Sequence, residues 1–344
     1  MDTEFVNLGK SMIVPSVQEL AKYPLTKIPP RYLRPHEELH SISPSPHIPS
    51  VPIIDLHKLA AGDFVDSELQ TLHSACSHWG FFQVVNHGVS ISLLDEFKLE
   101  IVNFFKLPHE DKKLLWQKPD NHEGFGQAFV VSQDQKLDWS DMFYITTLPY
   151  NLRNIDVFEK LPFKLRETLE VYCVQVKNLA MRILGYMAKA LNMDADEIKQ
   201  LFNDGVQAMR MNYYPPCPEP DMLDETDGLQ VRKDGKWVPI KPLPNAFVVN
   251  IGDIMEILSN GIYRSIEHRA VVNSTKQRLS IATFYSSKLD SELGPALSLI
   301  GPNNPANFQR IPLEKYLKEF FARKLDGKAY LDFMRIKSNE EHEN

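Results

Sequence analysis

The sequence predicts an α+β protein whose first half is mainly helical and whose second half is mainly β-sheet. Along residues 163–191 apolar side chains recur at steps of three and four, which predicts one long helix with a single buried stripe. From Gln207 onward, short runs rich in β-branched and aromatic residues are separated by turn residues, which is typical of strands. With 344 residues, of which 43% are hydrophobic, the chain can bury the core of one large domain or two modest ones.

The first 50 residues are predicted to form a proline-rich extension. A short helix is expected at residues 16–21, and the prolines that follow predict a chain that runs extended over the surface. Residues 51–200 are expected to combine helices with a few strands. The predicted strands are 51–56 and 81–85, and the predicted helices are 67–79, 93–105, 109–116 and 163–191. Gly80 is placed to end the first of these helices.

Residues 205–310 are predicted to form the β-sheet domain, and residues 311–344 to form C-terminal helices and a charged tail. The predicted strands are 208–214, 229–232, 236–240 and 246–251, followed by a short helical turn at 253–259. Asp234 and Gly235 are a strong turn signal, so the second and third strands should pair as a hairpin. The continuous apolar run at 246–251 predicts a strand buried on both faces.

Composition argues against several classes of function. A formal charge of −7 and a pI near 5.9 disfavour a nucleic-acid-binding surface. No apolar run approaches the length of a membrane span, and no leader peptide is recognisable, so a cytoplasmic protein without membrane contact is expected. Three cysteines without CxxC spacing disfavour a disulfide framework or structural zinc and fit a reducing compartment. No heptad or apolar surface stripe indicates a protein partner or an oligomeric state.

One stretch, residues 260–284, contains a candidate metal ligand and a candidate anion clamp. His268 stands at the start of a segment rich in β-branched residues, and a polar turn follows. Beyond that turn, Arg278 and Ser280 alternate with apolar residues, so on a strand both would lie on one face. A guanidinium and a hydroxyl on one face can hold a carboxylate, although a lone strand arginine can equally belong to a solvated face.

Several motifs resemble those of plant 2-oxoglutarate/Fe(II)-dependent dioxygenases, and the resemblance extends from about residue 48 to about residue 336. The motifs are VPIIDL with Asp55, WGFFQVVNHG from Trp79, Leu107-Pro108, NYYPPCP from Asn212, NIGD from Asn250, NGIYRSIEHRAVVN with His268, and RLSIATF with Arg278. Within the family, the sequence looks most similar to the branch that contains alkaloid O-demethylases, norcoclaurine-synthase-like proteins and senescence-related oxidoreductases.

The resemblance implies a double-stranded β-helix, or jelly-roll, flanked by helices, with Fe(II) and 2-oxoglutarate as cofactors. It makes His268 the distal histidine of the iron-binding triad, and Arg278 with Ser280 the binders of the far carboxylate of 2-oxoglutarate. Asn212 and Tyr214 match positions that help to hold the keto-acid end. The positions that it places at the substrate pocket are Phe125, Gln127, Phe129 and Phe284.

The sequence departs from the family after NYYPPCPEP, where the family continues with a strand that carries H-x-D, the other two iron ligands. Here about 20 residues, or roughly two strands, are missing between residues 220 and 228. We therefore expect a jelly-roll with unpaired strand edges and lower stability than intact relatives. His109 heads the one other H-x-D in the chain, but its surroundings are typical of an exposed helix start. Replacement carboxylates could come from Asp221, Asp224, Glu225 and Asp227, which otherwise form an acidic surface loop.

Three functions remain open. The first is an iron- and 2-oxoglutarate-dependent oxidoreductase that hydroxylates or O-demethylates a small aromatic plant metabolite, weak or inactive because one histidine with loose carboxylates makes a poor iron site. The second is a norcoclaurine-synthase-type condensation of an amine with an aldehyde, which needs acid–base residues rather than a metal. The third is a catalytically inactive ligand-binding remnant or splice product. The catalytic residues and the substrate are not indicated by the sequence.

Overall fold

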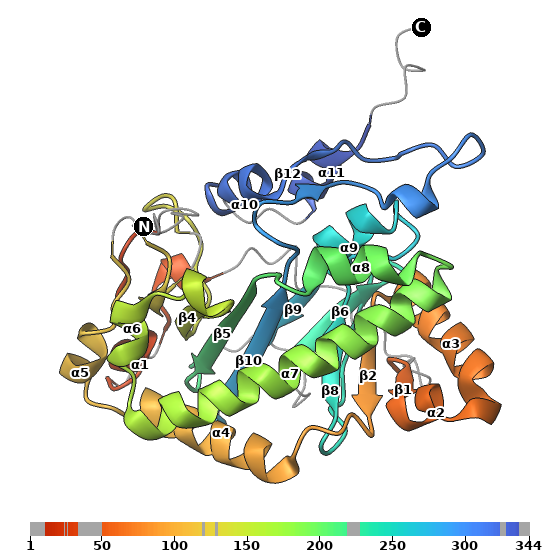
Figure 1. Ribbon diagram of the computed structural model, residues 1–344. Helices are drawn as coiled ribbons and strands as arrows, with labels where there is room; N and C mark the ends of the chain where they lie inside the picture. The colour runs from red at the N-terminus through yellow and green to blue at the C-terminus, as the bar shows by residue number, and fades with distance from the viewer. Residues whose placement is uncertain are drawn as a thin grey trace, which may run out of the picture.

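Strands between residues 124 and 285 form two sheets of a jelly-roll, and the long helix α7 (Phe163–Ala190) crosses the outer side of the first of them (Figure 1). The computed structural model describes residues 11–23, 25, 27–33, 50–118, 121–127, 130–218, 228–323 and 328–336. The first sheet has the order β10-β5-β4-β3, and the second has the order β7-β6-β9. Their strands are β3 (Gly124–Gly126), β4 (Asp141–Leu148), β5 (Gln207–Tyr214), β6 (Leu229–Lys233), β7 (Lys236–Pro239), β9 (His268–Ala270) and β10 (Arg278–Tyr285).

A third sheet, with the order β1-β2-β8, lies next to the first sheet on the side of β10. It contains β1 (Ile53–Asp55), β2 (Phe81–Val85) and β8 (Phe247–Asn250), with β2 parallel to β1 and antiparallel to β8. The predicted helix 67–79 is present as α3 (Val65–Ser74) and a π-helical turn at Ala75–Trp79, and it ends at Gly80 in the left-handed conformation. A side chain at Gly80 would lie 2.2 Å from the carbonyl oxygen of Arg264, so glycine is required at this position on two grounds.

Two helices, α4 (Ile91–Phe105) and α7 (Phe163–Ala190), form the apolar floor beneath the first sheet. The predicted stripe of α7 is confirmed, since Leu165, Leu169, Tyr172 and Val176 are all buried. Phe97 of α4 stacks on Tyr172 with ring centroids 4.1 Å apart. The remaining helices are α1 (Val17–Leu20), α2 (Leu56–Ala60), α5 (His109–Lys113), α6 (Ile155–Glu159), α8 (Ala195–Phe202), α9 (Asp253–Leu258), α10 (Leu313–Phe321) and α11 (Ala329–Met334).

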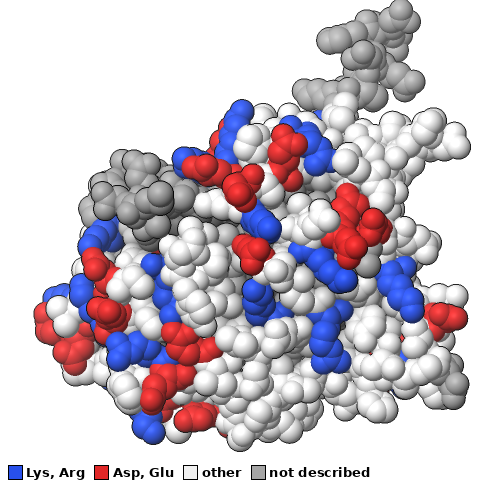
Figure 2. Space-filling view, in the orientation of Figure 1, with Lys and Arg blue, Asp and Glu red and all other residues white. Residues whose placement is uncertain are grey.

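The C-terminal helices pack back on the domain, as the sequence predicts. α10 and α11 lie beside a short hairpin, β11 (Glu292–Leu293) with β12 (Ile311–Pro312), and Leu313 and Met334 are fully buried. Acidic and basic side chains are interspersed on the face in Figure 2. Within the described residues, no helix combines the length and apolarity that crossing a membrane requires.

The strand at 246–251 is present as β8, but the prediction that both its faces are buried is wrong. All four residues of β8 are partly or fully exposed, and so are all eight residues of β10, whereas β4 and β5 are mostly buried. The reason lies in the pairing: among the described residues, β8 pairs only with β2 and β10 only with β5. Each therefore has one free edge, which agrees with the expected incomplete jelly-roll.

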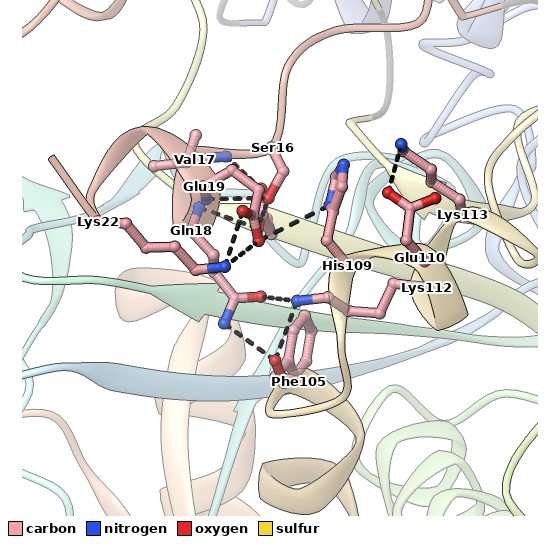
Figure 3. Close-up of polar contacts among 11 residues, drawn as sticks. Ser16, Val17, Gln18, Glu19, Lys22, Phe105, His109, Glu110, Lys112 and Lys113 are labelled. Atoms are coloured by element: carbon pink, nitrogen blue, oxygen red, sulfur yellow. Dashed lines mark hydrogen bonds and ion pairs between the residues drawn. The ribbon is translucent and has the colours of Figure 1, made fainter.

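The N-terminal extension is attached to the domain by a buried carboxylate. Asp141, at the start of β4, accepts hydrogen bonds from the Ser16 hydroxyl at 2.6 Å and from the backbone N–H groups of Val17 at 2.6 Å and Gln18 at 3.1 Å. These donors open helix α1, so the carboxylate also complements the positive end of the helix. Lys112 of α5 donates to the Gln18 side chain at 2.7 Å, as Figure 3 shows. Together these contacts hold α1 against the sheet.

We expect Asp141→Asn to release α1 and to lower the free energy of unfolding by roughly 3 kcal/mol. The amide keeps one acceptor oxygen but replaces the other with an N–H group, which then faces either the Val17 N–H or the Ser16 and Gln18 donors and leaves buried groups unsatisfied. Thermal unfolding measures the loss, and limited trypsin digestion at the exposed Lys22 reports release of the helix. Asp134→Asn, on an exposed turn, is the matched control. Equal digestion of both variants would show that Asp141 does not hold the extension.

Candidate functional site

The inner face of the first sheet, on the side away from α4 and α7, brings together four of the predicted site residues. Arg278 of β10 lies opposite Tyr214 of β5, and Ser280 lies opposite Asn212. Residues that pair across strands project to the same side of a sheet, so all four side chains share this face. The Asn212 amide donates a hydrogen bond to the Ser280 hydroxyl at 3.2 Å, which fixes both groups beside Arg278.

The guanidinium of Arg278 is positioned to bind an anion. Its carbon lies 5.1 Å from the ring centre of Tyr214, and one of its terminal nitrogens is buried without a hydrogen-bond partner among the described residues. Gly228 packs against the same side chain, because a Cβ at this position would lie 2.2 Å from Nε. A buried donor without a partner costs free energy, and a carboxylate ligand would satisfy it with two parallel hydrogen bonds.

His268 approaches from the opposite sheet, where it pairs with Val231 of β6. Its ring lies 5.2 Å from that of Phe81, and its Nδ1 lies 3.3 Å from the carbonyl oxygen of Ile266. The residue is exposed to solvent, but Phe81 and Ile266 lie close to its ring and shield part of it. This partial removal from bulk water lowers the pKa of the imidazole, and the charges of Lys328 and Arg210 act in the same direction. The neutral form, which binds metals, is thereby favoured.

The described residues do not complete an iron site around His268. Among them, no three histidine, cysteine, aspartate or glutamate side chains gather closely enough to hold a metal ion. The four carboxylates considered as replacements, Asp221, Asp224, Glu225 and Asp227, lie outside the described residues. The second H-x-D does not contribute: His109 begins α5, and its Nδ1 lies 3.7 Å from Glu19 of α1 (Figure 3). The described part of the chain therefore provides one imidazole, that of His268, and the clamp of Arg278 and Ser280 that can bind a carboxylate.

Arg210 on the inner face was missed by the sequence prediction. This residue of β5 lies between Tyr144 of β4 and Ala282 of β10, and its buried Nε has no hydrogen-bond partner among the described residues. Its guanidinium carbon is 5.7 Å from the ring centre of Phe284, whose predicted place at the pocket is compatible with this position. Arg210 precedes Asn212 by two residues, so the period of a strand could have identified it.

Glu123, just before β3, adds a buried carboxyl group beside Tyr144. One oxygen accepts a hydrogen bond from the backbone N–H of Thr146 at 2.9 Å, and the other is buried with no partner in the described part of the chain. Burial raises the pKa of this carboxyl group to about 7, and burial, with a further contribution from the charge of Glu123, also raises the pKa of Tyr144. A titratable group near neutrality therefore lies within electrostatic reach of the inner face.

Two of the predicted pocket residues lie elsewhere. Phe125 pairs with Phe143 and is buried with Phe104 and Phe105 on the helix side of the sheet, so its predicted place in the pocket is not supported. Gln127 is buried and donates hydrogen bonds to the carbonyl oxygens of Asp138 and Ser140, which is a structural role. Phe129 lies outside the described residues.

Comparison with known proteins identifies the family. Residues 205–287, which include the whole clamp, match the model of the 2OG-Fe(II) oxygenase superfamily, and residues 51–162 match that of the non-haem dioxygenase in morphine synthesis N-terminal region. The chain belongs to the 2-oxoglutarate/Fe(II) dioxygenase family. This membership supports Fe(II) and 2-oxoglutarate as cofactors and an oxidoreductase as the class of protein.

Individual members of the family match this chain over nearly its whole length. Protein SRG1 of Arabidopsis thaliana is 50% identical, with 95% of this chain and 97% of the relative covered. Codeine O-demethylase of Papaver somniferum is 49% identical, with 96% and 98% covered, and S-norcoclaurine synthase 1 of Coptis japonica is 39% identical, with 98% and 100% covered. The crystal structure of JOX2 in complex with 2OG, Fe and JA is 33% identical, with a TM-score of 0.85 and 96% and 100% covered.

The length of one of these alignments bears on the segment that is predicted to be missing from this chain. The alignment with Protein SRG1 has 348 positions but covers 95% of a chain of 344 residues. The relative therefore contributes aligned positions that have no counterpart here. This shortfall agrees with the predicted loss of a segment and with the two free strand edges.

Proposed function

We propose that this protein is a 2-oxoglutarate/Fe(II)-type oxidoreductase for hydroxylation or O-demethylation of a small aromatic plant metabolite, and that the chain as it stands is weak or inactive. The observation that carries this proposal is the inner face, where Arg278, Ser280 and Asn212 form a carboxylate clamp opposite a single imidazole, His268. The aromatic rings of Tyr144 and Phe284 on the same face favour a flat, apolar substrate. Relatives named as O-demethylases of codeine and of flavonoids support this class of substrate.

The chain's own residues would bind and orient the keto acid. The fork of Arg278 suits the far carboxylate of 2-oxoglutarate, and the Ser280 hydroxyl can donate to the same group while accepting from Asn212. The described residues provide only one candidate ligand for iron, so we derive no oxidative step. A facial triad requires two imidazoles and one carboxylate to fix the metal, and a single ligand cannot fix it.

A specific observation favours the condensation of an amine with an aldehyde as the second candidate. Glu123, with its pKa raised to about 7, provides an acid–base group of the kind that such a reaction needs without a metal. One relative, S-norcoclaurine synthase 1, is named for a synthase activity. We also propose that the protein acts in the cytoplasm and that its partner is a small molecule.

The test is an Fe(II) titration by calorimetry, with and without 2-oxoglutarate, followed by turnover of 2-oxoglutarate. We expect no tight binding near one equivalent and little turnover, and His268→Ala should remove the weak iron binding that remains. Tight binding that 2-oxoglutarate strengthens would contradict the proposed inactivity. Formation of product from an arylethylamine and an arylacetaldehyde in the presence of a chelator would instead favour condensation.

A further inference from the structure

The free edges of β8 and β10 border one apolar slot. The slot is lined by Phe247 of β8, Leu279 and Ile281 of β10, and Leu94, Phe97, Lys98 and Tyr172 of the two floor helices. In this lining, one strand edge stands on each side and the helices α4 and α7 lie beneath. Because β8 and β10 each pair on one side only among the described residues, the slot is bounded by backbone groups that lack strand partners.

We propose that this slot binds one extended peptide segment of a partner protein, which adds a strand between β8 and β10. A strand edge presents alternating N–H and C=O groups, and only another extended backbone can satisfy them in register along two sides. A compact small molecule could fill the apolar floor but would leave both edges unpaired. The unpaired strand edges therefore favour an occupant in the extended conformation, and the apolar lining favours apolar side chains on it.

The apolar lining of the slot requires apolar residues at alternate positions of the peptide. On β10, Leu279 and Ile281 project toward the helices, while Arg278 and Ser280 project to the inner face. A strand beside β10 must follow the same alternation, so every second residue should be apolar and should contact Phe97 or Tyr172. Lys98 is exposed at this lining and forms no ion pair in the described part of the chain, so an acidic residue near the end of the peptide would be complementary.

The described strands of a second copy of the chain do not fit this requirement. Each of them is already paired with at least one neighbour in its own sheet. A strand inserted between β8 and β10 needs both of its edges free, so a second copy would have to unfold part of a sheet to supply one of these strands. A segment that is extended and unpaired before binding pays no such cost, which favours a peptide partner.

The test uses a fluorescein-labelled peptide of eight residues that alternates threonine with valine or leucine and ends in glutamate. Eight residues match the length of β10. Fluorescence anisotropy should show binding to the full chain. Binding should weaken at least tenfold for the variant Ile281→Glu, which places a charge in the apolar lining of the slot. It should weaken equally for a peptide with a central proline, because proline removes one hydrogen bond between the strands. The control Leu99→Glu, exposed on α4 outside the slot, should bind like the wild type.

Hydrogen exchange of the wild-type chain tests the proposal even if the variant Ile281→Glu is poorly folded. The slot-facing amides of β8 and β10 in the wild-type chain should exchange at least tenfold more slowly with the peptide bound. Absence of peptide binding, or equal binding to Ile281→Glu and Leu99→Glu, would overturn the proposal. Amides that are already protected in the free monomer would show that the chain fills its own slot, and protection in a dimer detected by light scattering would show that a second copy does. Both results would also overturn it.

Discussion

Arg278→Met is expected to weaken 2-oxoglutarate binding about 100-fold, because it removes both hydrogen bonds of the guanidinium fork. A bidentate pair of charge-assisted hydrogen bonds contributes roughly 3 kcal/mol, which corresponds to a factor of this size. Arg278→Lys keeps the charge but loses the fork, so a loss of about tenfold is expected. Equilibrium dialysis with labelled 2-oxoglutarate measures both changes without requiring turnover.

The control for this prediction is Arg232→Met. Arg232 lies on β6, is about half exposed, and pairs with Glu267 at 2.6 Å outside the inner face. Its loss should leave 2-oxoglutarate affinity unchanged. If the wild-type chain binds no 2-oxoglutarate, or if Arg278→Met binds as well as the wild type, the assignment of the clamp is wrong. Thermal unfolding of each variant separates a binding defect from a folding defect.

The clamp could be placed from sequence because it depends on a local period. Two residues separated by one position on a strand share a face, so the spacing of Arg278 and Ser280 carries the geometry by itself. The hairpin could be placed for the same kind of reason, since Asp234 and Gly235 both adopt the positive φ angles that the turn requires. The stripe of α7 is also local, and its predicted burial is confirmed.

Features that depend on a neighbour in space could not be predicted in this way. The apolar run of β8 suggests a doubly buried strand, but its burial requires an adjacent strand that the described structure does not provide. Strand β4 was not predicted, since its residues are buried on both faces and show no alternation. The direction of Phe125 was missed because two flanking glycines give no pattern that distinguishes the faces.

Glu123→Gln is expected to stabilise the protein by about 3 kcal/mol at pH 8 and to be nearly neutral at pH 4. Burial raises the pKa of Glu123 from 4.5 to about 7, so between these values the folded chain keeps a proton that the unfolded chain has released. The free energy of unfolding of the wild type must then fall as the pH rises through this window. Glutamine remains neutral throughout, and it can keep the hydrogen bond from the backbone of Thr146.

Urea denaturation of wild type and variant across the same pH range tests this prediction, and the difference between the two curves removes the contribution of other titrating groups. Glu110→Gln is the matched control, since Glu110 is exposed and its hydrogen bond with Lys113 lowers its pKa. The difference in free energy of unfolding between wild type and Glu110→Gln should change at pH values below the usual pKa of glutamate, and with the opposite sign. At these pH values the native state binds fewer protons than the unfolded state. Parallel curves for wild type and Glu123→Gln would mean that the carboxyl group reaches water. In that case Glu123 could not serve as the near-neutral acid–base group that the condensation chemistry requires.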